Sequence, residues 1–223
     1  MRVLALETST EYCSVALWQD GAVSDHCELA GQTHSVMLIP MLDALLREAR
    51  VTLADLDGIA FGAGPGSFTG VRIACSAAQG LALGAEKPVI GISTLQALAQ
   101  ASGRNKVIAV LDARMAEVYY AAYEKNNGVW VTVCEPCLCL PQDTPPVEGY
   151  DWFGVGSGFV AHGEQLRARY SGNLAGVDEK AIPQAAAIAR LAAPLFAAGR
   201  GVDAADAMPL YLRDKVALKT SER

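Results

Sequence analysis

The first thirty residues alternate between apolar and polar positions in three short runs. These runs, roughly 2–8, 11–19 and 22–30, are typical of β-strands, whose side chains point to opposite faces in turn. Asp20 and Gly21 separate the second run from the third, and both residue types favour the positive φ of a tight hairpin turn. The pattern therefore predicts that the chain opens with three antiparallel strands.

The residues that follow predict helices and strands in alternation. Apolar residues recur at helical spacing over residues 34–49, which predicts a helix. There follow a buried strand (DLDGIAFGAG), a helix (TGVRIACSAAQGLALGA), a strand (PVIGIS) and a helix (TLQALAQAS). Strands that alternate with helices indicate an α/β domain with a partly parallel sheet.

The second half of the chain repeats this order. From Lys106, KVIAVLDARMAEVYYAAYEKNNGVWVTVCE contains an apolar strand ending in an acid, an alternating strand, an Asn-Gly turn and a third strand. Superposing Glu7 on Asp112 places Val15 on Tyr120, which indicates an internal duplication. A strand (WFGVG) and two helices (SGFVAHGEQLRARY and IPQAAAIARLAAPLFAAG) complete the second unit. We predict two similar ββ(β)αβα domains, at residues 1–103 and 104–223.

This organisation is that of the actin-like ATPase fold (ASKHA, RNase H-like). In ATPases of this fold, the acid that ends the first strand and the turn beside it hold phosphates and magnesium. The corresponding positions here are Glu7, Thr8, Ser9 and Asp112. The second turn, DARMAE, carries bulky side chains where a phosphate loop needs small residues with free N–H groups. We therefore expect a vestigial nucleotide cleft, with no nucleotide bound by this chain alone.

Composition narrows the classes of function. Of the 223 residues, 52% are apolar and 19% charged, which allows a substantial core. A net charge of −6 without a run of basic residues argues against stand-alone binding of nucleic acid. No signal peptide stands out, and no apolar run reaches the ~18 residues of a membrane span. We expect a cytoplasmic protein without membrane attachment, whose six cysteines are reduced.

A cysteine cluster raises the question of a metal site. Cys134, Cys137 and Cys139 form a C-x-x-C-x-C pattern, but a zinc or iron–sulfur site needs a fourth ligand. The other cysteines are scattered, and the three histidines are isolated from one another: Cys13, Cys27, Cys75, His26, His34 and His162. We therefore expect no metal site, and interpret the cluster as small, half-buried residues near the end of a strand.

Residues 62–80, GAGPGSFTGVRIACSAAQG, allow two interpretations. The glycine-rich turn could hold a phosphate, with Thr69 capping the next helix and Arg72 adding a charge, but it lacks the Gly-Lys-Ser/Thr ending of a P-loop. Alternatively, Gly70, Ala74 and Ala77 share one helix face that a second helix could approach closely. The residues alone are equally consistent with two roles for this helix face: contact with a partner, and packing on the chain's own sheet.

The segments VLALETST, GAGPGSFTGVRIACSAAQGLA, VIGISTLQALA and PLYLRDKVA closely resemble the TsaB family, also called YeaZ, of bacterial tRNA threonylcarbamoyladenosine biosynthesis proteins. The likeness covers nearly the whole chain. It implies a non-catalytic subunit that forms homodimers alone and binds its paralogue TsaD, with the ATPase TsaE joining the assembly. TsaD transfers threonylcarbamoyl to the adenosine beside the tRNA anticodon. By this resemblance, the chain meets tRNA only through the complex, and ATP and the metal ion belong to partner subunits.

The resemblance also implies roles for particular residues. Where TsaD carries an H-x-x-x-H metal pair, this chain has Thr94 and Leu98, which argues against catalysis. The resemblance favours the partner-contact interpretation, with binding residues on two helices: His34, Leu38, Leu42, Leu45, Gly70, Arg72, Ala74, Ala77 and Leu81. The turn that positions the second helix comprises Gly64, Pro65, Gly66, Ser67 and Thr69. We expect the segment from Pro209 to pack back on the first domain, ahead of a polar, frayed tail.

Two enzymatic alternatives stay open. A stand-alone peptidase would need a nucleophile such as Ser67, Ser76 or a cysteine, but the chain has no G-x-S-x-G elbow and no histidine can be nominated as its base. A small-molecule kinase of the same fold would need a phosphate loop, which the bulky second turn disfavours. The scaffold subunit is the function that we expect.

Overall fold

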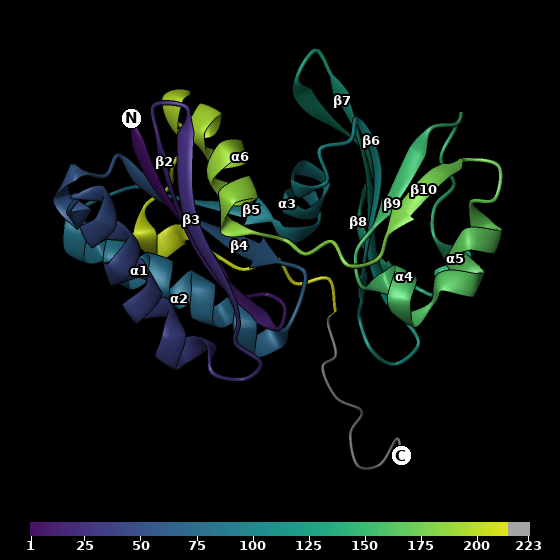
Figure 1. Cartoon of the computed structure of the whole chain (residues 1–223), viewed down its shortest axis with the longest axis horizontal. Coiled ribbons are helices and arrows are strands. Elements are labelled where there is room, and N and C mark those ends of the chain that lie inside the picture. The colour runs from purple at the N-terminus through teal and green to yellow at the C-terminus, as the bar shows by residue number, and fades with distance from the viewer. Residues whose placement is uncertain (214–223) are drawn as a thin grey trace.

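Two five-stranded sheets organise the chain, and helices pack on both (Figure 1). The computed structural model describes residues 1–213. The first sheet has the order β3-β2-β1-β4-β5, with strands β1 (Arg2–Glu7), β2 (Tyr12–Gln19), β3 (Ala22–Leu29), β4 (Gly58–Gly64) and β5 (Val89–Ser93). The second has the order β10-β9-β6-β7-β8, with strands β6 (Lys106–Asp112), β7 (Val118–Asn126), β8 (Val129–Cys139), β9 (Trp152–Val155) and β10 (Leu174–Asp178). The fold is α/β and actin-like, as predicted.

The two sheets have the same topology, which confirms the duplication. In each, the first strand pairs antiparallel with the second and parallel with the fourth. The superposition that we predicted is wrong by one residue at the first strand. Val15 lies opposite Leu6, whereas Tyr120 lies opposite Val110. If Val15 corresponds to Tyr120, Asp112 corresponds to the residue after Glu7, because the second connection is one residue longer.

Helices cover both faces of the first sheet. Helices α1 (His34–Ala49) and α2 (Phe68–Ala85) lie side by side on one face, and α6 (Ala185–Ala197) covers the other (Figure 1). Leucines of α1 and small residues of α2 enter one core with Leu4 and Leu6, whereas alanines of α6 pack with Val3 and Ala5. Alternate side chains of β1 therefore pack in two separate layers of core, one on each face of the sheet.

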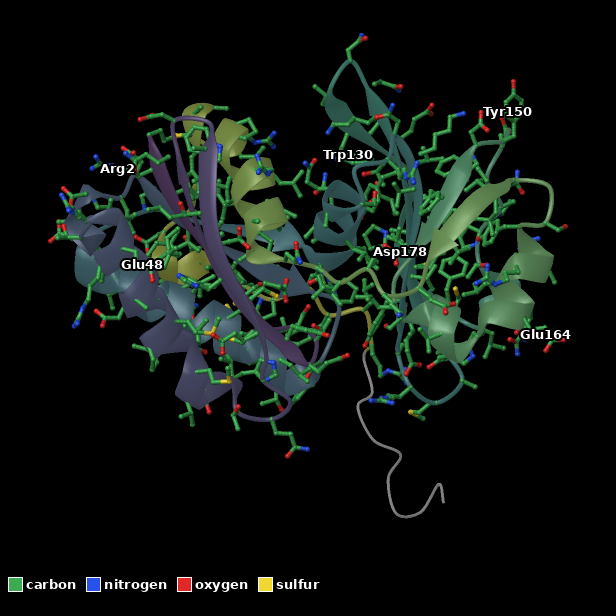
Figure 2. All side chains as sticks on the ribbon, in the orientation of Figure 1. Arg2, Glu48, Trp130, Tyr150, Glu164 and Asp178 are labelled. Atoms are coloured by element: carbon green, nitrogen blue, oxygen red, sulfur yellow. The ribbon has the colours of Figure 1, made fainter. Side chains whose placement is uncertain are left out.

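Helix α6 follows the second sheet in the chain but packs on the first. It contacts β1 and β2, and the amide of Ala185 donates to Ser14 Oγ at 2.9 Å. Helix α3 (Thr94–Ala101) lies between the two sheets, where Leu95 and Leu98 pack with residues of β6 and β7. Across the same junction, Trp130 at the start of β8 donates to Gln100 at 2.7 Å (Figure 2). The predicted domain boundary at residue 103 separates the two sheets. It also assigns α6 to the second domain, although α6 covers the sheet of the first.

The second domain differs from the predicted pattern in two places. The helix expected in SGFVAHGEQLRARY is interrupted at His162, which gives α4 (Gly158–Ala161) and α5 (Gly163–Arg169). His162 has φ −136°, which is not helical, and a glycine follows it. Strand β10 was not predicted, because its five residues, LAGVD, lack a clear alternation. Residues 1–213 also contain three short 3-10 helices: η1 (Leu53–Asp55), η2 (Pro141–Asp143) and η3 (Ala204–Asp206).

The segment after η3 stays on the first domain as far as Leu210. The amide of Leu210 donates to the Ala63 carbonyl of β4 at 2.7 Å, and the Ala207 carbonyl accepts from Gln79 of α2 at 3.0 Å. The polar tail that we expected, residues 214–223, lies outside the described residues. Within residues 1–213, no helix combines the length and the apolar character needed to cross a bilayer.

Candidate functional site

Glu7 ends β1 inside the first domain and is 1% exposed. The amide of Ser9 donates to its Oε1, and its Oε2 has no hydrogen-bond partner within residues 1–213. Burial raises the pKa of this carboxyl above its ordinary value of 4.5, and hydrogen bonds from Ser9 and Thr8 oppose that rise. Glu7 is therefore not displayed in a cleft, contrary to our expectation.

The start of α2 covers the residues after Glu7. Thr8 Oγ1 donates to the Gly70 carbonyl at 2.7 Å, and the Ser67 amide donates to the Ser9 carbonyl at 2.8 Å. Thr8 and Ser9 are both buried. A loop that held phosphate would need these groups open to solvent, but here they fasten the turn to the strand.

Asp112 has a different environment. Its Oδ1 accepts from the Arg114 amide at 3.0 Å and lies 3.6 Å from His162 Nε2, and its Oδ2 lies 3.5 Å from the Arg114 guanidinium. The Asp112 amide donates to Ser157 Oγ at 3.1 Å. The Arg114 guanidinium and amide and the His162 ring thus already surround this acid.

The two acids do not form one pocket. A hollow of about 480 Å³ lies at the start of β6, whereas Asp112 is at its end; the lining residues are Gly103, Arg104, Asn105, Lys106, Asp151, Phe153 and Ala175. Neither acid is among them. Within residues 1–213, no group of three or more His, Cys, Asp or Glu side chains is placed to hold a metal ion. Cys134, Cys137 and Cys139 are free thiols that pack beside the core of the second domain.

The two positions that we expected to match a metal pair in TsaD have structural roles here. Thr94 is fully buried, and its Oγ1 accepts from the Gly64 amide at 3.1 Å. Leu98 is also fully buried and packs between the two sheets. One position therefore holds the glycine-rich turn, and the other contributes to the core.

The turn from Gly64 to Thr69 positions α2, but its cap is not the one predicted. Ser67 is the N-cap, because its Oγ accepts from the Gly70 amide at 3.3 Å. Thr69 lies exposed in the first turn of the helix, so its predicted capping role is wrong. Gly66 sits close to Ser9: a Cβ on Gly66 would lie 2.6 Å from the Ser9 carbonyl oxygen. The amides of Ser67 and Gly70 are already bonded within the chain, so neither is free for a phosphate.

The small face of α2 approaches the chain's own sheet. Gly70 and Ala74 are buried, as are Ala78 and Ala82, and a Cβ on Gly70 would overlap the Thr8 carbonyl oxygen. The prediction that Gly70 and Ala74 contact a partner is wrong, because β1 and β4 already occupy that face. Of the residues predicted on α2, only Arg72, Ala77 and Leu81 are partly exposed.

The predicted residues of α1 are also internal. Leu38, Leu42 and Leu45 belong to the core of the first domain, and Leu38 is 1% exposed. His34 is buried and donates to the Tyr12 carbonyl at 3.2 Å. These four side chains secure α1 to the sheet, so they are not available to a partner in the folded chain.

Other apolar residues of these helices are exposed. Val36 and Ile39 on α1 are 71% and 49% exposed, and Leu83 on α2 is 74% exposed. Pro40, Ser76, Gly80 and Gly84 are exposed as well. We call this set the outer α1/α2 face. The signal for Val36 and Ile39 was present in the sequence, since both are out of phase with the Leu38–Leu42–Leu45 stripe.

Arg72 lies beside this face among aromatic rings. Its guanidinium carbon is 3.2 Å from the centroid of the Phe68 ring and 5.0 Å from that of Tyr211. Its Nη1 has no hydrogen-bond partner in the described part of the chain. Phe68 and Tyr211 are both exposed, so a cation and two rings meet at the surface by the start of α2.

Comparison with known sequences agrees with this architecture. A model of the TsaD family, described as tRNA N6-adenosine threonylcarbamoyltransferase, matches residues 26–220. Two curated proteins named tRNA threonylcarbamoyladenosine biosynthesis protein TsaB match nearly end to end. The Escherichia coli protein is 42% identical, covering 98% of this chain and 97% of its own. The Haemophilus influenzae protein is 37% identical, covering 98% and 96%.

Two solved structures from Pseudomonas aeruginosa share the fold. One, described as an uncharacterized protein with similarity to the peptidase YeaZ, has a TM-score of 0.89 at 40% identity. The other, described as YeaZ, has a TM-score of 0.85 at 39% identity. Each covers 95% of this chain and 99% of its own. With the duplicated sheets, these likenesses define a protein of the actin-like ATPase fold. The chain belongs to the TsaB (YeaZ) family.

Proposed function

We propose that this chain is a non-catalytic scaffold subunit for threonylcarbamoyl transfer to the adenosine next to the tRNA anticodon. It acts by binding TsaD and, with it, TsaE. The observation that carries the proposal is the outer α1/α2 face, where two neighbouring helices expose Val36, Ile39 and Leu83. Exposed apolar side chains on two adjacent helices favour cover by a second protein.

The surroundings of Glu7 and Asp112 support a non-catalytic role. Glu7 is buried beneath the α2 turn, and Arg114 and His162 lie against Asp112. Thr94 and Leu98 stand where the paralogue has metal ligands, and neither is open to a ligand. In this proposal the partner subunits supply ATP and the metal ion, and tRNA is bound through the complex.

The same face serves two associations. Alone, the chain forms a homodimer through the outer α1/α2 face, and TsaD replaces the second copy. Two helices from each partner then meet in a four-helix contact. Arg72 adds specificity, because no carboxylate within residues 1–213 pairs with its guanidinium, which therefore favours an acidic group on the protein that docks there.

The decisive experiment measures threonylcarbamoyl transfer to tRNA by purified TsaD and TsaE with the threonylcarbamoyl donor. We expect product only when this chain is present, and no product from this chain with the donor alone. Equal yields with and without the chain would show that it is not a required subunit. Product from the chain alone would overturn the non-catalytic assignment.

A peptidase role has less support. Ser67 Oγ is used as the helix cap, and Ser76 lies exposed on α2. The histidines contact Glu48, the Tyr12 carbonyl and Asp112, and within residues 1–213 none hydrogen-bonds to a serine or a cysteine. A nucleophile needs an adjacent base to react at neutral pH, so the described residues offer no activated one.

A further inference from the structure

Residues 207–213, which we call the strap, run between the two domains (Figure 1). On the first domain, the Leu210 amide donates to the Ala63 carbonyl at 2.7 Å, and the Ala207 carbonyl accepts from Gln79 at 3.0 Å. The strap also lies close to Gly64, because a Cβ there would be 3.0 Å from the Leu210 carbonyl oxygen. It is therefore packed against the end of β4.

The middle of the strap touches the start of α2. The ring of Tyr211 is 6.2 Å from that of Phe68 and 5.0 Å from the guanidinium carbon of Arg72. Arg72 contacts Phe68 on its own helix, so the strap adds a second ring to an existing cation–aromatic contact. Anything that docks on Phe68 and Arg72 consequently meets Tyr211 as well.

The last described residue of the strap binds the second domain. Arg213 Nη2 is 2.8 Å from the Glu117 carboxylate and 3.0 Å from the Ala113 carbonyl oxygen. The two charged side chains are only 16% and 29% exposed. A partly shielded pair with a second hydrogen bond holds a defined geometry better than a pair in open solvent.

Arg213 binds both ends of a strained turn. Between Ala113 and Glu117, three successive residues have left-handed φ: Arg114 at 62°, Met115 at 55° and Ala116 at 60°. None is a glycine, and residues with a Cβ keep this conformation only where their surroundings fix it. Asp112 fixes one end by accepting from the Arg114 amide, and Arg213 fixes both.

The strap is placed to restrain the angle between the sheets. The chain crosses between the domains at residues 102–105 and 181–184, and α3 packs at that junction. A junction of this kind allows one domain to rotate against the other unless a second contact opposes the rotation. The strap is such a contact, since it joins β4 and α2 of one domain to the β6–β7 turn of the other.

We propose that the strap is a latch that fixes the angle between the two sheets and transmits docking on α2, through Tyr211, to the β6–β7 turn. The second part rests on the proposed function. A protein bound over Phe68 and Tyr211 holds the strap in place, so docking and the latched angle favour each other. The β6–β7 turn is then the element of the second domain that responds to a partner on the first.

The angle itself is tested in the full chain by residual dipolar couplings. Arg213→Met keeps an unbranched side chain but removes the guanidinium, and Arg167→Met is the matched control, because the Arg167–Glu179 pair lies within the second domain. We expect couplings from Arg213→Met that no longer fit the parent arrangement of the two domains, and couplings from Arg167→Met that do. An unchanged arrangement in Arg213→Met overturns the latch. If that variant does not fold, Glu117→Gln tests the same pair with the same two outcomes.

Calorimetric titration with TsaD tests the transmission. We expect Arg213→Met to weaken binding by about fivefold or more, with Arg167→Met unchanged. Val36→Asp tests the proposed docking surface separately from the strap, since it changes the outer α1/α2 face and leaves the strap intact. Parent affinity in Val36→Asp rejects the docking surface. Loss of binding in Val36→Asp with parent affinity in Arg213→Met rejects the transmission alone.

Discussion

The carboxyl group of Glu7 fills the space that a side chain on Gly62 would need. The two residues lie on the neighbouring strands β1 and β4, and a Cβ on Gly62 would overlap Glu7 Oε2. Gly62 thus provides room for an acid that ends inside the first domain. An acid enclosed in this way supports the arrangement of the strands and is not free to receive a ligand.

The stability of the protein should depend on pH through Glu7. Burial raises the pKa of its carboxyl above 4.5, so the folded chain favours the protonated form. The stabilising contribution is then fully present below the unfolded pKa, and it is lost as pH rises toward the folded pKa. Glu7→Gln stays neutral, so we expect its free energy of unfolding to improve relative to the parent between about pH 5 and about pH 8. Urea denaturation at both pH values measures the difference.

Glu164→Gln is the control for this experiment, because Glu164 lies exposed on α5 (Figure 2). The difference in free energy of unfolding between Glu164→Gln and the parent should be the same at both pH values. If Glu7→Gln instead loses stability relative to the parent as pH rises, Glu7 is needed in its ionised form, and the interpretation of a buried neutral acid is wrong.

A pair of glycines on α2 tests how closely this helix approaches β1. A Cβ on Gly70 would overlap the Thr8 carbonyl oxygen, whereas a Cβ on Gly80 has nothing within 4 Å. We expect Gly70→Ala to destabilise the chain by about 1–3 kcal/mol, because backbone must move to admit the methyl group. Gly80→Ala should stabilise it by up to about 1 kcal/mol through helix propensity. Urea denaturation of both variants gives the comparison, and equal effects would contradict the close approach.

Local patterns predicted most elements of the fold. Helix α1 has the predicted bounds, 34–49, and the three opening strands agree within one residue at each end. These elements are specified by periodicity and by the Asp20-Gly21 turn, which are properties of neighbouring residues. The position of α6 could not be predicted in the same way. Its alanine-rich pattern indicates a buried face but does not say which sheet buries it.

The candidate site was predicted less well, for a related reason. Leu38, Leu42 and Leu45 form the apolar stripe of α1, and a stripe of this kind is equally typical of a core and of an interface. The residues of the stripe pack in the core, because the helix cannot pack on its sheet without them. The apolar residues left for a partner lie outside the stripe, as Val36 and Ile39 do. The approach of Gly70 to Thr8 depends on residues far apart in the sequence, so no local pattern reveals it.

Cys137 should be the most reactive thiol at neutral pH. It lies two residues from Cys139 on β8, so both project from the same face of the strand. A hydrogen bond with Cys139 lowers the pKa of Cys137 to about 7, whereas burial raises the pKa of Cys13 to about 11. The thiolate is the nucleophile, so iodoacetamide should alkylate Cys137 first. Mass spectrometry of peptides over time measures the order.

Cys139→Ala removes the hydrogen bond that stabilises the Cys137 thiolate, because alanine has no donor. We expect slower alkylation of Cys137 near neutral pH and a rate that approaches the parent value as pH rises. Cys75→Ala is the control, since Cys75 is buried in the first domain. An unchanged rate in Cys139→Ala would show that another group sets the reactivity of Cys137.

Two neighbouring residues of α1 separate folding from association. Val36 is 71% exposed and Leu38 is 1% exposed. Val36→Asp should change the free energy of unfolding by about 0.5 kcal/mol, as is usual for surface positions. Leu38→Asp should cost more than about 4 kcal/mol, because it leaves a gap and buries a charge. Urea denaturation measures both changes.

The association itself is measured by sedimentation velocity, alone and with TsaD. We expect Val36→Asp to remain folded but monomeric and to fail to bind TsaD, because a carboxylate replaces an apolar contact within the proposed interface. Ala74→Glu is not an equivalent probe, since Ala74 is fully buried and the variant should unfold. A folded Val36→Asp chain that still dimerises and binds TsaD would place the interface elsewhere, and the exposed apolar residues of α1 and α2 would need another explanation.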